Sequence, residues 1–185
     1  MKMEVLKRLI SVDEYHKMAE IGILKPDDRL ELINGEIFEM TPIGSKHAAI
    51  VDHLAMKMNQ LLSGQVIVRI QNPLRLSVTN EPEPDISILT YRSDFYASAH
   101  PVPADVLAII EVSNASIKFD KEVKAPLYAV HGIPEYWIID LENNRVEVFS
   151  NVKEGTYSKT KVYLPGEEIS LIDKKFAVND VFILG

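Results

Sequence analysis

The sequence predicts an α/β fold, of the α+β kind, in which a mixed β-sheet is flanked by helices and carries extra β-hairpins. Three observations predict it: short apolar runs rich in isoleucine and valine, longer segments with helical periodicity, and turn dipeptides between them. The chain has 185 residues, 46% of them hydrophobic, and no linker or low-complexity tract. We therefore expect residues 1–185 to form a single domain.

A short helix is expected near the N-terminus. Ser11 and Glu14 have the spacing of a capping box, in which each side chain bonds to the backbone N–H of the other residue. The helix should end near Ile21, because Gly22 readily takes the left-handed conformation that closes helices.

A β-hairpin should follow this helix. Its strands are expected over 29–33 and 36–40, joined by a two-residue primed turn at Asn34-Gly35. In this register Glu31 lies opposite Phe38, so a carboxylate is expected among apolar side chains.

The segment from Ser45 to Leu62 predicts a second helix, with Ser45 as its N-cap and Gly64 as its stop. Its apolar stripe would consist of Ile50, Val51, Leu54, Met58, Leu61 and Leu62. His47 lies in the first turn on the stripe side. A histidine there is more often a packing or capping residue than a general base, and its cation would oppose the helix dipole.

Several strands are expected in the middle of the chain. The apolar runs place them over 65–70, 74–78, 85–90 and 106–110. Pro84 precedes the third of these strands, where a proline removes little ladder hydrogen bonding. Residues 91–105 contain two prolines and should form a loop.

A helix is expected over 119–131, but Pro126 would remove a hydrogen bond in its interior. Either the regular helix begins near Glu122, with the proline in its first turn, or the helix is kinked. A hairpin across Asn143-Asn144 should follow, with strands over 135–140 and 145–150. Two further short strands are expected, around Val162 and around Ile169.

Cysteine is absent, which excludes disulfides, thiolate zinc sites and cysteine nucleophiles and fits a reducing cytoplasm. The first eight residues interleave charged and apolar side chains without the apolar core of a signal peptide. No apolar run reaches membrane-spanning length. We therefore expect a soluble cytoplasmic protein with no membrane contact.

The net charge of −7 counts against a protein that coats nucleic acid without specificity. One stretch, 41–79, is nevertheless basic. Against the single acid Asp52, it carries Lys46, Lys57, Arg69 and Arg75. These charges could face nucleic acid or could be the solvated ends of a helix and two strands, and the sequence leaves both open.

The most informative feature is a pair of carboxylates beside apolar runs. Asp85 follows Pro84 at the start of one run, and Glu111 ends the run 106–110. Acidic side chains are rarely buried unless they are paired or bound to a metal. Two carboxylates about 4 Å apart would repel by roughly 4 kcal/mol at an effective dielectric of about 20, and a divalent cation would remove that cost. We therefore predict a Mg²⁺ or Mn²⁺ site at Asp85 and Glu111, with the carbonyl oxygen of Val112 as a further ligand.

Two of the acidic residues have a second interpretation. Asp85 could simply cap the turn beside Pro84. Glu31 could be a third acid that binds the metal through water, or it could pair with an arginine inside the fold. Gln71 follows a strand that heads towards the site and could orient a ligand, and Trp137 is expected in the core.

These residues resemble the PD-(D/E)XK nuclease superfamily, in which a Pro-Asp enters one strand and a glutamate follows on the next. The flanking residues resemble, more closely, the Uma-type endonuclease family. The resemblance spans nearly the whole chain and rests on an ordered set of motifs: Glu31-Leu-Ile-Asn-Gly-Glu36, Met40-Thr41-Pro42, His47, Pro84-Asp85, Glu111-Val112-Ser113, Asp120 with Lys124 and Tyr128, and Gly132-Ile-Pro-Glu-Tyr-Trp137.

The resemblance implies a restriction-endonuclease-like fold and an endonuclease that hydrolyses phosphodiester bonds of nucleic acid with Mg²⁺ or Mn²⁺. Asp85 and Glu111 would hold the metal, and a lysine would position the attacking water. The lysine of the superfamily pattern, two residues after the glutamate, is replaced here by Ser113. Lys124, on the following helix, is the expected substitute.

Asp120, Lys124 and Tyr128 are spaced i, i+4, i+8 and would share one helix face. The same spacing would also suit an ordinary surface ion pair between Asp120 and Lys124, worth a few tenths of a kcal/mol. Lys121 and Lys118 are the alternatives for the catalytic lysine.

Two functions remain open from the sequence. The first is a Mg²⁺-dependent endonuclease, with DNA as the expected substrate although no residue distinguishes it from RNA. The second is a catalytically inactive nucleic-acid- or protein-binding module with the same fold, in the form of a homodimer for example. Asp85, Glu111, Glu31 and Lys124 together favour the first, whereas Ser113 and the net negative charge favour the second. We adopt the endonuclease as the expectation.

Overall fold

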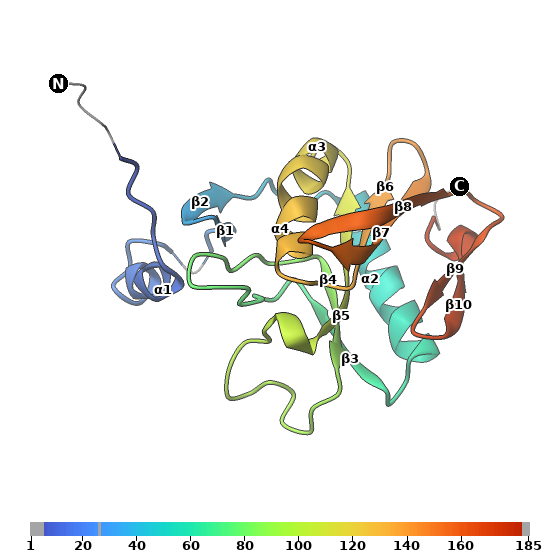
Figure 1. The fold of residues 1–185 in the computed structure, drawn as a ribbon, viewed down its shortest axis with the longest axis horizontal. Helices are drawn as coiled ribbons and strands as arrows, with labels where there is room; N and C mark the ends of the chain where they lie inside the picture. Colours follow the sequence, from blue (N-terminus) through green and yellow to red (C-terminus); the bar gives the residue numbers. More distant parts are fainter. Residues whose placement is uncertain (1–5, 26, 183–185) are drawn as a thin grey trace.

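A computed structural model describes residues 6–25 and 27–182. It shows a mixed six-stranded sheet with helices on both faces and two separate hairpins, which confirms the predicted α+β architecture (Figure 1). Residues 1–5, on which part of the signal-peptide argument rests, lie outside the described residues. Within the described ranges, no helix combines the length and apolar character needed to cross a membrane.

The six strands of the main sheet lie side by side in sequence order. They are β3 (Val66–Ile70), β4 (Ile86–Thr90), β5 (Val106–Ser113), β6 (Glu135–Asp140), β7 (Arg145–Lys153) and β8 (Thr156–Tyr163). All neighbours are antiparallel except β5 and β6, which are parallel. A parallel pair needs a crossover connection, and a helical segment between β5 and β6 supplies it. The hairpin predicted across Asn143-Asn144 is confirmed as β6 and β7.

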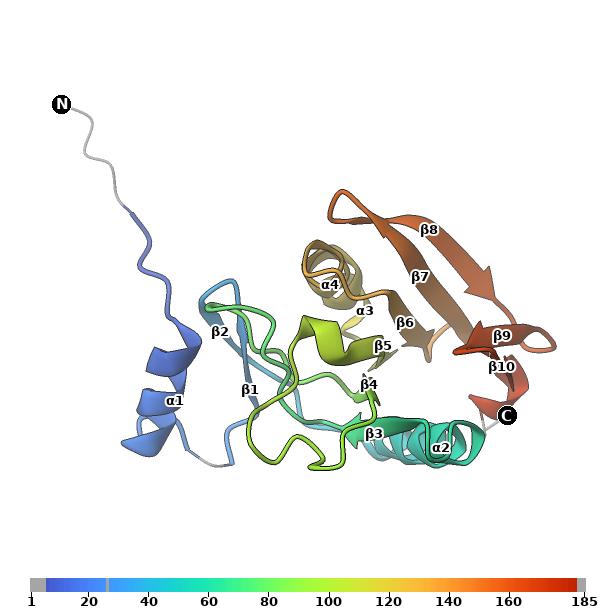
Figure 2. The ribbon, with the colours of Figure 1, turned by 60° about the horizontal axis from the view of Figure 1, so that its bottom comes forward.

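The sheet carries a separate apolar core on each face. Helix α2 (Ser45–Leu61) covers one face and helix α4 (Ala125–Val130) covers the other (Figure 2). Leu54 of α2 and Trp137 of β6 are fully buried in the core between this helix and the sheet, so the prediction that Trp137 is a core residue is confirmed. Tyr128 is fully buried in the core beneath α4.

Helix α1 (Val12–Glu20) begins at the predicted capping box. The Glu14 N–H donates to Ser11 Oγ at 3.2 Å, and the Ser11 N–H donates to the Glu14 carboxylate at 2.9 Å. Gly22, just beyond the helix, has a positive φ of 78°. Both predicted boundaries of this helix are therefore confirmed.

The first hairpin, β1 (Leu30–Ile33) and β2 (Glu36–Glu39), lies outside the main sheet. Its register places Glu31 opposite Phe38, as predicted. Asn34-Gly35 forms the predicted primed turn, with φ values of 52° and 73°. The turn therefore determines on which face of the hairpin the Glu31 carboxylate lies.

Gly35 is required by its backbone angle and by its neighbour. A Cβ at Gly35 would lie only 2.6 Å from Leu9 Cβ, whereas a Cβ at Gly22 would meet nothing within 4 Å. Both glycines have positive φ, so Gly22→Ala should cost about 1 kcal/mol of backbone strain. Gly35→Ala should cost at least about 1 kcal/mol more, because overpacking adds to the strain. Urea unfolding of both variants measures the difference, and equal losses would contradict this expectation.

The predicted N-cap of the second helix is wrong by one residue. Gly44 is the N-cap of α2, and Ser45 is its first helical residue. Glycine and serine are both accepted at N-caps, so propensity alone does not separate the two positions. The buried stripe is otherwise as predicted, except that Leu61 is half-buried and Ala55 joins the buried residues.

The strand predicted over 74–78 is also wrong. That segment forms an irregular turn, in which the Leu74 N–H donates to the Pro82 carbonyl at 2.9 Å and the Leu76 N–H donates to the Asn80 carbonyl at 3.0 Å. Prolines on both sides of the segment have no N–H to donate, so a regular ladder cannot form there.

The C-terminal strands are longer and more numerous than predicted. The strand expected near Val162 is the eight-residue β8, joined to β7 by a tight turn at Glu154-Gly155. The strand expected near Ile169 is β9 (Glu168–Leu171), which pairs with an unpredicted strand, β10 (Lys174–Ala177). Two 3₁₀ turns complete the described elements: Pro103–Asp105, within the predicted loop, and Val178–Asp180.

Neither expectation for the helix around Pro126 describes the structure fully. The helical path begins with α3 (Ile117–Phe119), widens into a π-helical turn over Asp120–Lys124 and continues as α4. Pro126 lies in the first turn of α4, as one alternative required, but the path starts earlier than Glu122. Single π turns are frequent at functional sites, and this one ends at Lys124.

Candidate active site

Asp85 and Glu111 lie next to each other across the β4–β5 pair. Asp85 directly precedes β4, and Glu111 is the sixth residue of β5, so it lies within the strand instead of at its end. The Asp85 N–H donates to Glu111 Oε2 at 3.2 Å, and the Val112 N–H donates to Asp85 Oδ2 at 2.9 Å. The main chain of Asp85 therefore contacts the Glu111 carboxylate, and the residue after Glu111 contacts the Asp85 carboxylate, while the sharing of one cation by the two carboxyl groups stays a prediction.

Three donors hold the Asp85 carboxylate. The Nε2 of His47 donates to Oδ2 at 3.0 Å, the amide of Gln71 donates to Oδ1 at 3.1 Å, and the third donor is the Val112 N–H. Burial acts to raise the pKa of Asp85, but His47 and the other two donors lower it below its ordinary value. Asp85 is therefore ionised at neutral pH. His47 contacts the site directly, so it is more than the packing residue that its position suggested.

Lys124 points at Glu111, one of the two carboxylates predicted for it, and its second partner is Glu31 instead of Asp85. Its Nζ lies 2.9 Å from Glu111 Oε1 and 3.0 Å from Glu31 Oε1, and its side chain is only 1% exposed. The hydroxyl of Tyr128 donates to the same Glu111 oxygen at 3.1 Å. A buried ammonium thus bridges two buried carboxylates that come from different parts of the fold.

The charges around Lys124 shift the pKa values of its partners. Burial raises the pKa of Glu111 well above its ordinary value, Lys124 opposes this, and Asp85 and the other nearby carboxylates reinforce it. Burial acts to lower the pKa of Lys124, but Glu111 and Glu31 raise it above its ordinary value. Lys124 is therefore protonated, and the surrounding acids outnumber it.

Glu31 pairs with a lysine and not with the arginine that one expectation required. Its Oε1 also accepts the Glu83 N–H at 2.8 Å, while its Oε2 is buried without a hydrogen-bond partner. Glu83 is half-buried, and burial and the charge of Glu31 raise its pKa. The sequence analysis missed Glu83, although the alternation of acids and prolines in Glu81-Pro-Glu-Pro-Asp85 could have indicated it.

Asp120 does not form the surface ion pair with Lys124 that was the alternative interpretation of their spacing. It accepts hydrogen bonds from the hydroxyls of Ser113, at 2.7 Å, and Ser116, at 2.8 Å. The spacing nevertheless places Asp120, Lys124 and Tyr128 inside the fold, because all three are buried. Ser113, at the lysine position of the superfamily pattern, therefore anchors the start of the helical segment that carries Lys124.

The two alternative lysines lie elsewhere. Lys121 reaches the neighbouring strand β7, where its Nζ lies 2.7 Å from Glu147 Oε1. Lys118 is exposed and lies 3.9 Å from Glu122. Neither forms an ion pair with Asp85 or Glu111, so Lys124 is the lysine of this site.

Two of the four basic side chains of the stretch 41–79 form ion pairs with acids, and a third contacts a neutral side chain. Lys57 pairs with Asp180 at 3.6 Å, and Arg75 pairs with Asp13 at 2.7 Å. Arg69 donates to the side chain of Asn72 at 3.1 Å. These contacts favour the interpretation of the stretch as ordinary polar ends of helix and strands.

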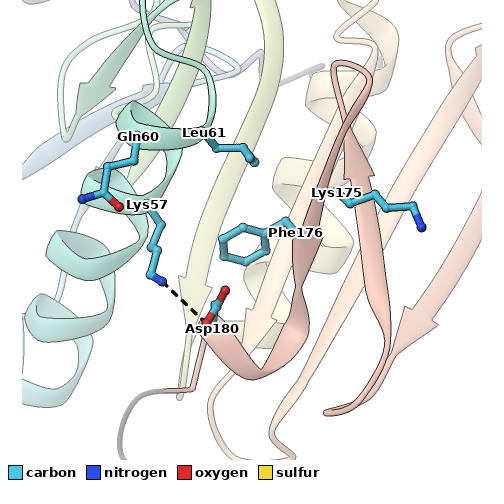
Figure 3. A pocket seen from close by; sticks show the side chains of 6 residues that line it. All are labelled: Lys57, Gln60, Leu61, Lys175, Phe176 and Asp180. Carbon is cyan, nitrogen blue, oxygen red and sulfur yellow. Dashed lines mark ion pairs between the residues drawn. The ribbon is translucent and has the colours of Figure 1, made fainter.

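A cavity of about 310 Å³ lies between α2 and the β9–β10 hairpin (Figure 3). Its lining residues are Lys57, Gln60, Leu61, Lys175, Phe176 and Asp180. Phe176 belongs to the core beneath α2, whereas Tyr128 of the carboxylate site belongs to the core beneath α4. The cavity contains none of the candidate site residues.

The donor set fits a hard cation by its chemistry. The described residues contain no group of three His, Cys, Asp or Glu side chains placed so that they could hold a metal ion together. Mg²⁺, however, commonly binds only one or two protein carboxylates and keeps several waters. Asp85 and Glu111 supply two carboxylates, and the unpartnered Oε2 of Glu31 supplies a buried acceptor nearby.

The fold and the sequence define a nuclease-like protein. Residues 12–174 match the family described as "Uma2: Putative restriction endonuclease", and the chain therefore belongs to that family. The structure is similar to the crystal structure of a protein from Anabaena variabilis described as "a putative nuclease belonging to DUF820", with a TM-score of 0.73. The two chains are 17% identical over 94% of this chain and 97% of that chain, so this likeness shows the fold alone. No curated protein matches this sequence.

Proposed function

We propose that this protein is a divalent-cation-dependent endonuclease that hydrolyses phosphodiester bonds of nucleic acid with Mg²⁺ or Mn²⁺. The observation that carries the proposal is the buried Lys124 ammonium, 2.9 Å from Glu111, whose other oxygen accepts the N–H of Asp85. The buried ammonium also lies 3.0 Å from Glu31, so one cation and several acidic side chains meet at this point of the fold. Membership of the restriction endonuclease family supports the same activity.

The roles of the residues follow from their contacts. Asp85 and Glu111 would hold the cation, with the carbonyl of Val112 and the unpartnered oxygen of Glu31 as further oxygen donors. When bound, such an ion polarises the phosphate and lowers the pKa of a coordinated water. Lys124, kept protonated by its two carboxylates, would orient that water or stabilise the negative charge that develops on the phosphate.

Lys124 would fill the role that Ser113 leaves vacant. The superfamily pattern places the lysine on the strand, two residues after the glutamate. Here the lysine comes from the helical segment that crosses over β5, and the bond from Ser113 to Asp120 fixes the start of that segment. Ser113 on the strand and Lys124 on the helical segment thus contribute to the same proposed site.

The direct test is cleavage by the purified full chain. Single- and double-stranded DNA and RNA should be incubated with the protein in Mg²⁺, in Mn²⁺ and in EDTA. We expect cleavage of at least one substrate with either metal and none in EDTA. Absence of metal-dependent cleavage of all four, together with a melting temperature that neither metal changes, would support the inactive binding module instead.

A further inference from the structure

Gln71 has an unusual backbone conformation at the edge of the site. It follows β3 directly, and its φ of 47° is left-handed, a region that residues other than glycine seldom occupy. Left-handed backbone in a non-glycine residue is more common at functional sites than elsewhere, so the contacts of Gln71 need explanation.

Gln71 binds Asp85 twice. Its main-chain N–H donates to the Asp85 carbonyl at 3.1 Å, and its side-chain amide donates to Asp85 Oδ1, also at 3.1 Å. The pairing of Ile70 with Ile86 makes Gln71 and Asp85 the next pair beyond the regular β3–β4 ladder. The left-handed turn thus lets one residue fix both the backbone and the carboxylate of Asp85.

The remaining donors act on the other oxygen. His47 and the Val112 N–H both donate to Asp85 Oδ2. A carboxylate offers about four acceptor positions, and these contacts together with Gln71 use three of them. The rotation of the carboxylate is therefore fixed from both sides, with one acceptor position left over.

We infer that Gln71 is a positioning residue, which orients the Asp85 carboxylate so that its remaining acceptor position faces the cation. This inference rests on the proposed function, because it assigns Asp85 as a metal ligand. Hydrogen-bond partners of metal-binding carboxylates fix their orientation, and loss of such a partner typically weakens metal binding about tenfold to hundredfold. Gln71 itself touches neither metal nor substrate in this role.

Gln71→Gly separates positioning from a purely structural role. Glycine accepts the left-handed angle without strain, so the melting temperature in EDTA should be unchanged or higher. The affinity for Mn²⁺, measured by calorimetry on the full chain, should nevertheless fall about tenfold or more. Gln71→Asn, which tolerates the angle but carries its amide on a shorter side chain, should lose affinity to a similar extent.

Asn144→Gly is the matched control, because Asn144 has a φ of 48°, is exposed and lies in the β6–β7 turn. It should leave the Mn²⁺ affinity unchanged. Wild-type affinity in either Gln71 variant would overturn the inference, as would a lower melting temperature in Gln71→Gly. If the wild type binds no Mn²⁺, the proposed function fails and the inference with it. If the wild type binds and Asp85→Asn weakens binding while Gln71→Gly does not, only the inference fails.

Discussion

Asp85→Asn should abolish metal-dependent cleavage while leaving the fold intact. Asparagine matches aspartate in size, so the change leaves no cavity, and its amide can still bond to His47 and to the Val112 N–H. What it removes is the negative charge that would hold the cation. Loss of about 4 kcal/mol of transition-state stabilisation corresponds to about a thousandfold slower cleavage.

Single-turnover cleavage in Mg²⁺ and in Mn²⁺ measures this loss, and a melting curve in EDTA checks the fold. Glu111→Gln should behave in the same way. Glu147→Gln is the control, because Glu147 is also a buried strand carboxylate and lies in the same row of the sheet, two strands away. It should retain cleavage. Activity close to wild type in Asp85→Asn would remove the metal site from this protein.

Elements set by neighbouring residues were predictable from the sequence. Asn34-Gly35 determines the turn type, the turn determines the register of β1 and β2, and the register places Glu31 opposite Phe38. The capping box at Ser11 is equally local. In both cases the residues that decide the structure lie within a few positions of each other, so no knowledge of tertiary packing is needed.

Elements decided by distant contacts were not predictable. The segment 74–78 has the composition of a strand, but prolines flank it and its main chain bonds to distant segments. The Arg75 N–H donates to the Pro101 carbonyl, and the Val78 carbonyl accepts the Val12 N–H. The π-helical turn before Pro126 lets a continuous helix carry a proline and still direct Lys124 to Glu111. Helix propensity is a property of single residues, so it does not indicate that this helix brings Lys124 to Glu111.

The same distinction applies to the candidate site. Asp85 and Glu111 could be selected because each borders an apolar run. Lys124 could be selected only through the family resemblance, because its partner Glu31 lies 93 positions away in the sequence. The acid–proline alternation of residues 81–85 could have indicated Glu83, but its contact with Glu31 depends on the tertiary structure, which brings together residues 52 positions apart.

Lys124→Met should destabilise the protein by about 3–5 kcal/mol in EDTA, measured by urea unfolding at pH 8. Methionine has a similar length, but it leaves the buried carboxylates of Glu31 and Glu111 without their cation, and an uncompensated buried charge costs about that much. Lys121→Met is the matched control on the same helical segment. Lys121 is 34% exposed, so loss of its pair with Glu147 should cost only about 1 kcal/mol.

Lys124→Met should be destabilised more at high pH than at low pH. Burial raises the folded-state pKa of Glu111 above 4.5, its ordinary value, and Lys124 is the main influence that opposes this rise. A raised folded-state pKa contributes stability that is fully present below about pH 4.5 and is lost as the pH rises through the folded value. Removing Lys124 raises the folded-state pKa of Glu111 further, so the loss of stability should extend over a wider pH range.

Lys124→Met should therefore be more stable at pH 5 than at pH 8, with a slope of up to about 1.4 kcal/mol per pH unit in the range where Glu111 titrates. The wild type should show the same sign over a narrower range. The double variant with Glu111→Gln should lose the part of this slope that Glu111 contributes, because the amide does not titrate. An unchanged slope in the double variant would assign the pH dependence to groups other than Glu111. Equal stability of Lys124→Met at pH 5 and pH 8 would mean that Glu111 is not held in a desolvated, acid-rich site.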